Sequence, residues 1–372
     1  MISKNNKGNR IFYIDQLRAF AIIAIVFAHV ALIWMNSKVG NFNLIVGYIF
    51  NVFGRYGVPI FLTLTGALLL NKNYDVYGFL KKRFPRILYP WIFWMILAIL
   101  VTIITKKPFL FNDIFLFLKF AIKTFLTSRW YVWMLIGVYL VIPIINEFVK
   151  NKGLKGVEYF LIIWFTTSMI SCISLYFNIS TYFLDLTFFA GPLGFVMLGY
   201  YLYKKEFKYS PNKLVIIGLI LFILGILLKV ILLWKGINIF VCRYYIFQTK
   251  SHLEIDIFAI IQTIGMFLSI KYLNSVNIKG VTNLSKLRVA ISNFLSTGIT
   301  KKLTNSLSKS SFGIYLNHYI FISIITFLNP KLINHDPLKW IPFLIIVVLI
   351  ASWGTILVIN KIPYMKKISG YY

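Results

Sequence analysis

The sequence predicts an all-α integral membrane protein, a bundle of about ten transmembrane helices with both termini cytoplasmic. Three observations predict this class. Of the 372 residues, 59% are hydrophobic and only 13% are charged, whereas a soluble domain is about 25% charged. The apolar residues form runs of about 20, the length at which a helix crosses a bilayer. Lys and Arg lie mostly between these runs. A soluble enzyme, a disordered chain and a disulfide scaffold are therefore poor fits.

Residues 14–360 are expected to form one membrane domain between a cytoplasmic N-terminus, 1–13, and a cytoplasmic tail, 361–372. The first apolar run follows a basic segment and has no small-residue cleavage pattern, so we expect it to be retained as a span. The predicted spans are 14–35, 44–70, 88–105, 131–148, 158–177, 184–203, 214–234, 254–273, 311–328 and 340–360.

A further apolar stretch, 112–127, predicts either a helix lying in the membrane interface or an eleventh span. Basic residues decide between them. With ten spans, the cytoplasmic segments hold more than twice as many Lys and Arg as the outer segments, and the excess reverses if 112–127 crosses. The positive-inside rule therefore favours ten spans, with 274–310 as a cytoplasmic loop.

The net charge of +29 has the same explanation, so membrane lipid rather than nucleic acid is the expected partner of the basic residues. The two cysteines form no CxxC motif. His252, Glu254 and Asp256 are closely spaced, but no second ligand cluster accompanies them, and we expect no metal site. Asp256 is expected to begin a helix instead.

The first span carries the most informative polar residues: Asp15, Arg18 and His29. Ionisable residues inside spans are costly and are functional candidates by default. Arg18 and His29 are 11 residues apart, so in a helix they share one face, about 16 Å apart along the axis. Asp15 precedes Arg18 by three positions and can pair with it. A membrane-edge ion pair and a packed histidine are the structural alternatives.

The spacing of Arg18 and His29 resembles that of the acyltransferase-3 family of integral membrane acyltransferases. The signature of this family is a basic residue, ten others and then histidine. Five more motifs follow in the family's order, and the resemblance covers roughly residues 10–360. They are Arg55 with Val58-Pro59 and Thr65-Gly66; Arg83 and Arg86; Trp130-Tyr131 with Tyr139-Leu140 and Pro143; Gly191-Pro192 with Leu198-Gly199; and Ser311 to His318. A histidine that many relatives carry before the fourth span is replaced here by Thr127-Ser128-Arg129. The chain is expected to be a stand-alone form without an esterase-like domain.

The resemblance implies an enzyme that moves an acyl group, often acetyl, from cytoplasmic acyl-CoA to a hydroxyl of a cell-envelope carbohydrate or glycolipid at the cell membrane. His29 would serve as the base that takes the hydroxyl proton, by direct transfer or through an acyl-imidazole. Arg18, Arg83 and Arg86 would hold the phosphates of the donor. Without the resemblance, the last two arginines equally fit a cluster that touches anionic lipid.

Other polar or aromatic residues are candidates for a polar interior, and packing is the alternative for each. Arg55 is expected deep in the second span, and His318 within the ninth. The whole set is Asp15, Arg55, Trp130, Tyr131, Ser311 and His318.

A transporter or flippase of the acyl donor or of a polysaccharide precursor is the alternative function, since intramembrane charges suit both classes. No inverted repeat of the kind common in transporters is visible. The sequence does not indicate an oligomeric state.

The topology gives a testable prediction. Single cysteines at positions 5, 210 and 306 should be protected from an impermeant thiol reagent in sealed cells, because these positions are expected to be cytoplasmic. Cysteines at positions 41 and 178 should be labelled. Labelling of position 210 from outside would contradict ten spans and support the eleven-span alternative.

Overall fold

The computed structural model describes residues 11–35, 40–106, 113–127, 130–177, 191–236, 256–275 and 283–372. In these ranges the chain is helical and contains no strand. Among the described residues, seven helical stretches are long and apolar enough to cross a membrane, one of them formed by α2 and α3 together, and α10 is a shorter apolar helix. The predicted all-α membrane fold is therefore confirmed. The helices are α1 (Phe12–Ala31), α2 (Asn41–Phe53), α3 (Gly57–Leu69), α4 (Val76–Lys106), α5 (Ile114–Thr127), α6 (Trp130–Phe177), α7 (Leu193–Lys204), α8 (Pro211–Gly236), α10 (Ile257–Leu273), α11 (Asn283–Ser296), α12 (Gly298–Leu328), α13 (Pro337–Lys361) and α14 (Lys366–Ser369).

The seven long helices differ in number from the ten predicted spans at three places. Helix α6 covers two predicted spans and turns at Gly153, whose φ of 59° is not helical. Helix α7 has 12 residues and α10 has 17, both shorter than a typical span. Residues 184–190 of the sixth predicted span lie outside the described residues. The number of spans and the side of the termini stay predictions.

The second predicted span, 44–70, corresponds to one of the seven, Asn41–Leu69, which is interrupted where α2 ends at Phe53 and α3 begins at Gly57. At the end of α2 the buried side-chain amide of Asn51 donates a hydrogen bond of 2.8 Å to the carbonyl of Ala28. A Cβ on Gly54 would overlap the backbone of α1 at Ala24 and Ala28. This close contact with α1 is a tertiary feature that hydropathy does not record.

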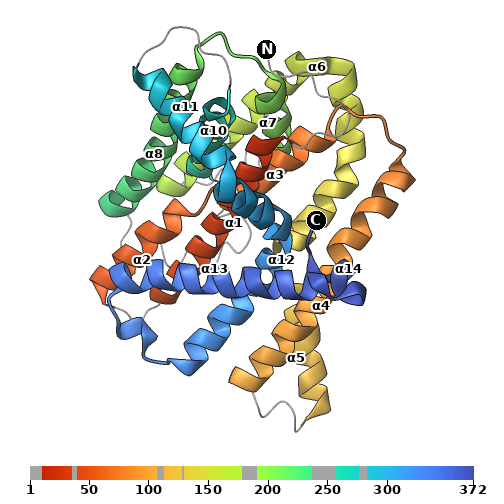
Figure 1. Ribbon diagram of the computed structural model, residues 1–372, viewed down its shortest axis with the longest axis vertical. Helices are drawn as coiled ribbons and strands as arrows, with labels where there is room; N and C mark the ends of the chain where they lie inside the picture. Colours follow the sequence, from red (N-terminus) through yellow and green to blue (C-terminus); the bar gives the residue numbers. More distant parts are fainter. Residues whose placement is uncertain are drawn as a thin grey trace. The chain divides into compact units, whose positions relative to one another are not determined.

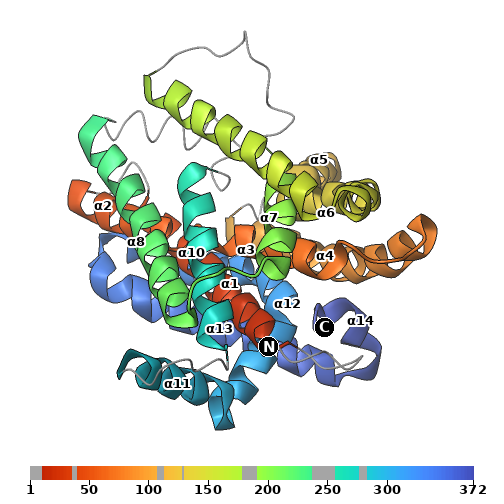
Figure 2. The same ribbon diagram turned by 90° about the horizontal axis from the view of Figure 1, so that it is seen from above.

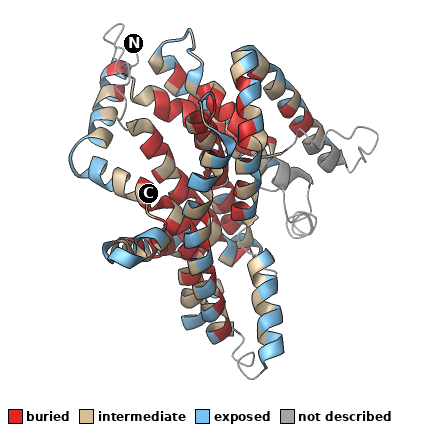
Figure 3. Ribbon diagram, turned by 90° about the vertical axis from the view of Figure 1, so that its right-hand side faces the viewer, coloured by how far each residue is buried: buried red, intermediate tan, exposed pale blue. Residues whose placement is uncertain are grey.

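The chain divides into two compact units, and each is described by itself. The first comprises residues Met1–Ala21, Arg55–Asn73 and Val141–Ser308. In it α3 packs against α7, and α8 packs against α10 (Figures 1 and 2). Along α8 the outer side chains Ile216, Ile220, Ile223 and Leu227 are exposed although they are apolar. Figure 3 shows exposed positions on several helices, and where these are apolar, as along α8, they suit contact with lipid.

The pairs α3–α7 and α8–α10 meet at glycines. A Cβ on Gly66 would overlap the backbone of Val196, and a Cβ on Gly199 would overlap the backbone of Thr63. The residues at these two contacts run in opposite order, so α3 and α7 are antiparallel. Glycine at these positions lets two backbones touch, as at many helix contacts in membranes.

In the first unit, basic side chains bind the last backbone carbonyls of two helices. The buried ammonium of Lys271 donates hydrogen bonds to the carbonyls of Leu202, at 2.6 Å, and of Tyr203, at 3.1 Å, in the last turn of α7. Arg288 of α11 donates to the carbonyl of Tyr272 at the end of α10. Cations stabilise helix C-termini because carbonyls there lack helical partners. The stretch 274–310, expected to be a loop by composition, thus contains α11 and the first part of α12.

An ion pair links α8 to the start of α10. The carboxylate of Asp256 binds the ammonium of Lys229 and accepts a hydrogen bond of 2.7 Å from the amide of Ala259. Asp256 is the N-cap of α10, which confirms the helix start predicted there. The pair neutralises a lysine that lies within a long apolar helix.

The second unit comprises residues Ile22–Gly54, Tyr74–Leu140 and Lys309–Tyr372. In it α4 contacts α5 and α14, and α13 contacts α2 and α14. The indole of Trp34 donates a hydrogen bond of 3.0 Å to the carbonyl of His335. The amide of Asn317 in α12 donates one of 3.1 Å to the carbonyl of Ser352 in α13. This unit contains both histidines that the sequence places within spans.

The glycine contact predicts a stability effect. Gly199→Ala should lower the free energy of unfolding by at least about 1–3 kcal/mol, because α3 must move away from the added methyl group. Gly137→Ala is the matched control, since a Cβ at this helical glycine meets no atom within 4 Å. Thermal unfolding in detergent micelles measures both variants. Equal transition temperatures for the two would contradict the backbone contact.

Candidate active site

Two histidines far apart in the sequence contact each other in the second unit. His29 lies near the end of α1, and His318 lies in α12. The Nδ1 atom of His29 is 3.0 Å from the Nε2 atom of His318. His318 is fully buried and His29 is half-buried. The sequence singled out each histidine, and the structure brings them together.

The hydrogen bonds assign the protons of this pair. The other nitrogen of His318, Nδ1, is 3.0 Å from the carbonyl oxygen of Ile314, which can only accept, so Nδ1 carries a proton. In neutral His318 the Nε2 atom is then an acceptor, and the Nδ1–H of His29 donates to it. The basic nitrogen of neutral His29 is therefore Nε2. A proton taken up there leaves the donated hydrogen bond in place.

Aromatic rings surround the histidine pair. The ring of Tyr319 lies 4.7 Å from that of His29 and 4.8 Å from that of His318, between centroids. Tyr315 lies 5.9 Å from His318, and Tyr131 of α6 lies 4.9 Å from Tyr315. These rings cover part of the pair, and a hydrogen bond is stronger where the surroundings are less polar than water. Sequence reasoning missed Tyr319, whose one signal was its position beside His318.

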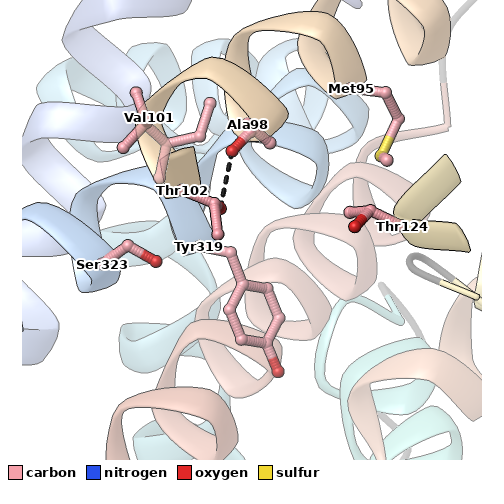
Figure 4. A pocket seen from close by; sticks show the side chains of 8 residues that line it. Met95, Ala98, Val101, Thr102, Thr124, Tyr319 and Ser323 are labelled. Carbon is pink, nitrogen blue, oxygen red and sulfur yellow. Dashed lines mark hydrogen bonds between the residues drawn. The ribbon is translucent and has the colours of Figure 1, made fainter. Parts of the chain in front are cut away.

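A pocket of about 180 Å³ adjoins Tyr319, between α4, α5 and α12. Figure 4 shows Met95 and Thr124 on one side of it, and Thr102 and Ser323 on the other. The Thr102 hydroxyl donates to the carbonyl of Ala98 at 2.7 Å. The lining is mostly apolar with a few hydroxyls, as in small-molecule sites. The whole lining is Met95, Ala98, Val101, Thr102, Thr124, Tyr319, Ile320 and Ser323.

The two arginines predicted to hold phosphate lie near the start of α4 in the same unit. The guanidinium of Arg83 is 6.0 Å from the ring centroid of Phe79, and that of Arg86 is 5.7 Å from the ring centroid of Tyr372. Arg86 is exposed and Arg83 is half-buried. Each guanidinium thus lies against an aromatic ring at a distance typical of cation–π contacts.

The other predicted site residues are spread over both units. Trp130 begins α6, with its ring 6.5 Å from that of Tyr131. Ser311 is buried in α12, seven residues before His318 and on the same face. Asp15 belongs to the first unit, and its buried carboxylate accepts a hydrogen bond of 2.7 Å from the hydroxyl of Ser308. Arg55 lies in the break between α2 and α3 rather than inside a helix.

Arg18 shares the continuous helix α1 with His29, as the spacing predicts. Within the described ranges, no group of three or more His, Cys, Asp or Glu side chains is placed to hold a metal ion. His252 and Glu254 lie outside those ranges. The described site places two imidazoles beside a ring that lines a small pocket.

Comparison with known families supports the family resemblance that these residues suggest. The acyltransferase domain family matches residues 11–359, nearly the whole chain. The chain belongs to the acyltransferase-3 family. It is accordingly a multi-pass membrane acyltransferase, from a family that acts on carbohydrates. No curated protein and no solved structure matches the sequence.

The histidine contact predicts the behaviour of an acyltransferase-3 variant. His318→Ala removes the acceptor of the His29 Nδ1–H and should lower the rate of acyl transfer about 10–100-fold, as loss of an orienting partner does elsewhere. His335→Ala is the matched control, because this histidine stacks on Trp340 away from the pair. Rates are compared at equal folded protein, judged by gel filtration. Equal activity of both variants would show that His318 is a packing group.

Proposed function

We propose that this acyltransferase moves an acyl group, acetyl in the first instance, from cytoplasmic acyl-CoA to a hydroxyl of a cell-envelope or surface carbohydrate, at the cell membrane. The observation that carries the proposal is the chain from His29 through His318 to the carbonyl of Ile314. It fixes one tautomer of His29, with its basic nitrogen at Nε2. A positioned neutral imidazole is the usual general base for a hydroxyl.

The proposed reaction begins when Nε2 of His29 takes the proton of the acceptor hydroxyl. The oxygen attacks the thioester carbonyl, and a carbon–oxygen bond forms. The carbon–sulfur bond then breaks, and the CoA thiolate takes the proton from His29. Throughout, the Nδ1–H of His29 donates to His318, which holds the imidazolium in place as an orienting partner does in other catalytic pairs. Direct transfer of this kind needs no covalent intermediate.

The donor is expected to approach from the side of α4. Arg83 and Arg86 are proposed to bind its phosphates, since planar guanidinium groups suit phosphate oxygens. Arg18 would contribute from α1, which also carries His29. The pocket beside Tyr319 is proposed to receive the acyl group, because that ring contacts both histidines.

The proposal predicts that His29→Gln abolishes transfer. An amide keeps hydrogen bonding but cannot take a proton at neutral pH, and loss of a general base costs about 10²–10⁴-fold. The purified variant in nanodiscs is assayed for acceptor-dependent release of CoA from acetyl-CoA. His335→Gln is the control. Near-normal activity of folded His29→Gln protein would refute the catalytic role.

The acceptor class is tested by mass spectrometry of surface carbohydrates from a strain that lacks this protein and from its parent. Loss of ester-linked acyl groups in the deletion strain is expected. Unchanged acyl esters would refute this acceptor class.

A further inference from the structure

The segment Ser369–Tyr372 follows the last predicted span and packs back onto α4 and α12 within the second unit. The amide of Gly313 in α12 donates a hydrogen bond of 3.2 Å to the carbonyl of Gly370. One turn earlier in α12, the carbonyl of Lys309 accepts one of 2.9 Å from the amide of Tyr372. The indole of Trp94 in α4 donates one of 3.3 Å to the carbonyl of Ser369. Figure 1 shows α14, which leads into this segment, beside α4.

Glycines make this contact possible. Gly370 has φ +81°, a conformation that favours glycine. A Cβ there would lie 2.8 Å from the Cα of Gly313, and a Cβ on Gly313 would approach the carbonyl of Ser369 too closely. Ser369 is fully buried. The segment is therefore an integral part of the unit.

Tyr372 connects this segment to the proposed donor site. Its ring lies 5.7 Å from the guanidinium of Arg86, and its hydroxyl donates a hydrogen bond of 2.9 Å to the backbone carbonyl of Arg86. Although 43% of its surface is exposed, the partial burial of Tyr372 raises the pKa of its hydroxyl to about 12, so it keeps its proton at physiological pH. The tyrosine thus contacts the arginine at two points, one at the side chain and one at the backbone.

Further basic residues lie in the helices next to this segment. The ammonium of Lys309 lies 6.0 Å from the ring of Tyr371. Lys366 and Lys367 of α14 are exposed, as is Arg86. The carbonyl of Lys367 lies 3.5 Å from the Tyr372 hydroxyl, which bonds to Arg86, and the carbonyl of Lys309 accepts from the Tyr372 amide, so both lysines are neighbours of this tyrosine. Several cations close together suit a ligand with several phosphate charges. Phosphate oxyanions of this kind occur on CoA and also on lipid headgroups.

We propose that Tyr372, held by the Ser369–Tyr372 segment, is a positioning residue that orients Arg86 for the phosphates of the acyl-CoA donor. This inference rests on the proposed function, which places those phosphates at Arg83 and Arg86. A guanidinium that is already ordered on a ring loses less conformational freedom when it binds phosphate. Tyr372 should therefore contribute to donor affinity and not to the chemical step.

The test compares two acetyl donors in nanodiscs of phosphatidylcholine alone. Tyr372→Ala should raise the KM for acetyl-CoA roughly 3–10-fold and leave kcat unchanged, because a ring contact and a hydrogen bond are lost. The KM for S-acetyl-pantetheine, which has no phosphate, should not change. Tyr372→Phe keeps the ring and should stay within about twofold of the wild type. Tyr364→Ala is the control, since this tyrosine is 95% exposed.

Gly370→Ala is a second variant that displaces the whole segment, and it should raise the KM for acetyl-CoA at least as much. Equal KM changes for both donors, a loss confined to kcat, or no change would overturn the inference. So would a difference that appears only in nanodiscs with anionic phosphatidylglycerol, since lipid would then be the ligand. Wild-type protein that uses neither donor would overturn the proposed function as well, whereas active wild type with unaltered variants would overturn this inference alone.

Discussion

The hydrogen bond between His29 and His318 joins the end of α1 to the middle of α12, and the candidate chemistry depends on it. Inside a membrane domain a polar side chain must find its partner within the protein, because lipid offers none. The two imidazoles satisfy each other, and the carbonyl of Ile314 fixes the proton on the far nitrogen. The ring of Tyr319 and the pocket beside it adjoin this pair, and the base role proposed for His29 rests on it.

Hydropathy predicted the helices of this fold well but not their interruptions. Long apolar runs such as 14–35 and 340–360 appear as α1 and α13, because length and composition alone decide whether a helix can span. The break between α2 and α3 was not predicted, since it depends on Gly54 meeting the backbone of α1. Helix α11 was also hidden, because its composition is that of a loop. Its Arg288 is buried against carbonyls at the end of α10, a partner that the sequence does not reveal.

The candidate site was predicted residue by residue but not as an assembly. His29 and His318 stood out because ionisable residues are rare in spans, yet 289 residues separate them and nothing in their spacing indicates contact. The pairing of Asp15 with Arg18 stays a prediction, whereas the structure shows its carboxylate accepting a hydrogen bond from Ser308, which is equally remote in sequence. Tyr372 gave no signal and Tyr319 only its position beside His318, because tyrosine is common in this chain and its role depends on which ring it faces. The sequence does not show which residues far apart along the chain contact each other, whereas the structure does.

The backbone contact between α3 and α7 has a consequence for how the protein depends on its surroundings. Where Gly66 and Gly199 bring two helices into direct contact, the space between them is too narrow for a hydrocarbon chain. Neither a lipid tail nor a detergent molecule can enter this space. The composition of the bilayer should therefore have little effect on the contact between the two helices. Contacts between helix backbones also favour weak Cα–H···O interactions, which do not require side chains. The packing of α3 against α7 within the first unit should therefore stay the same when the lipid environment changes.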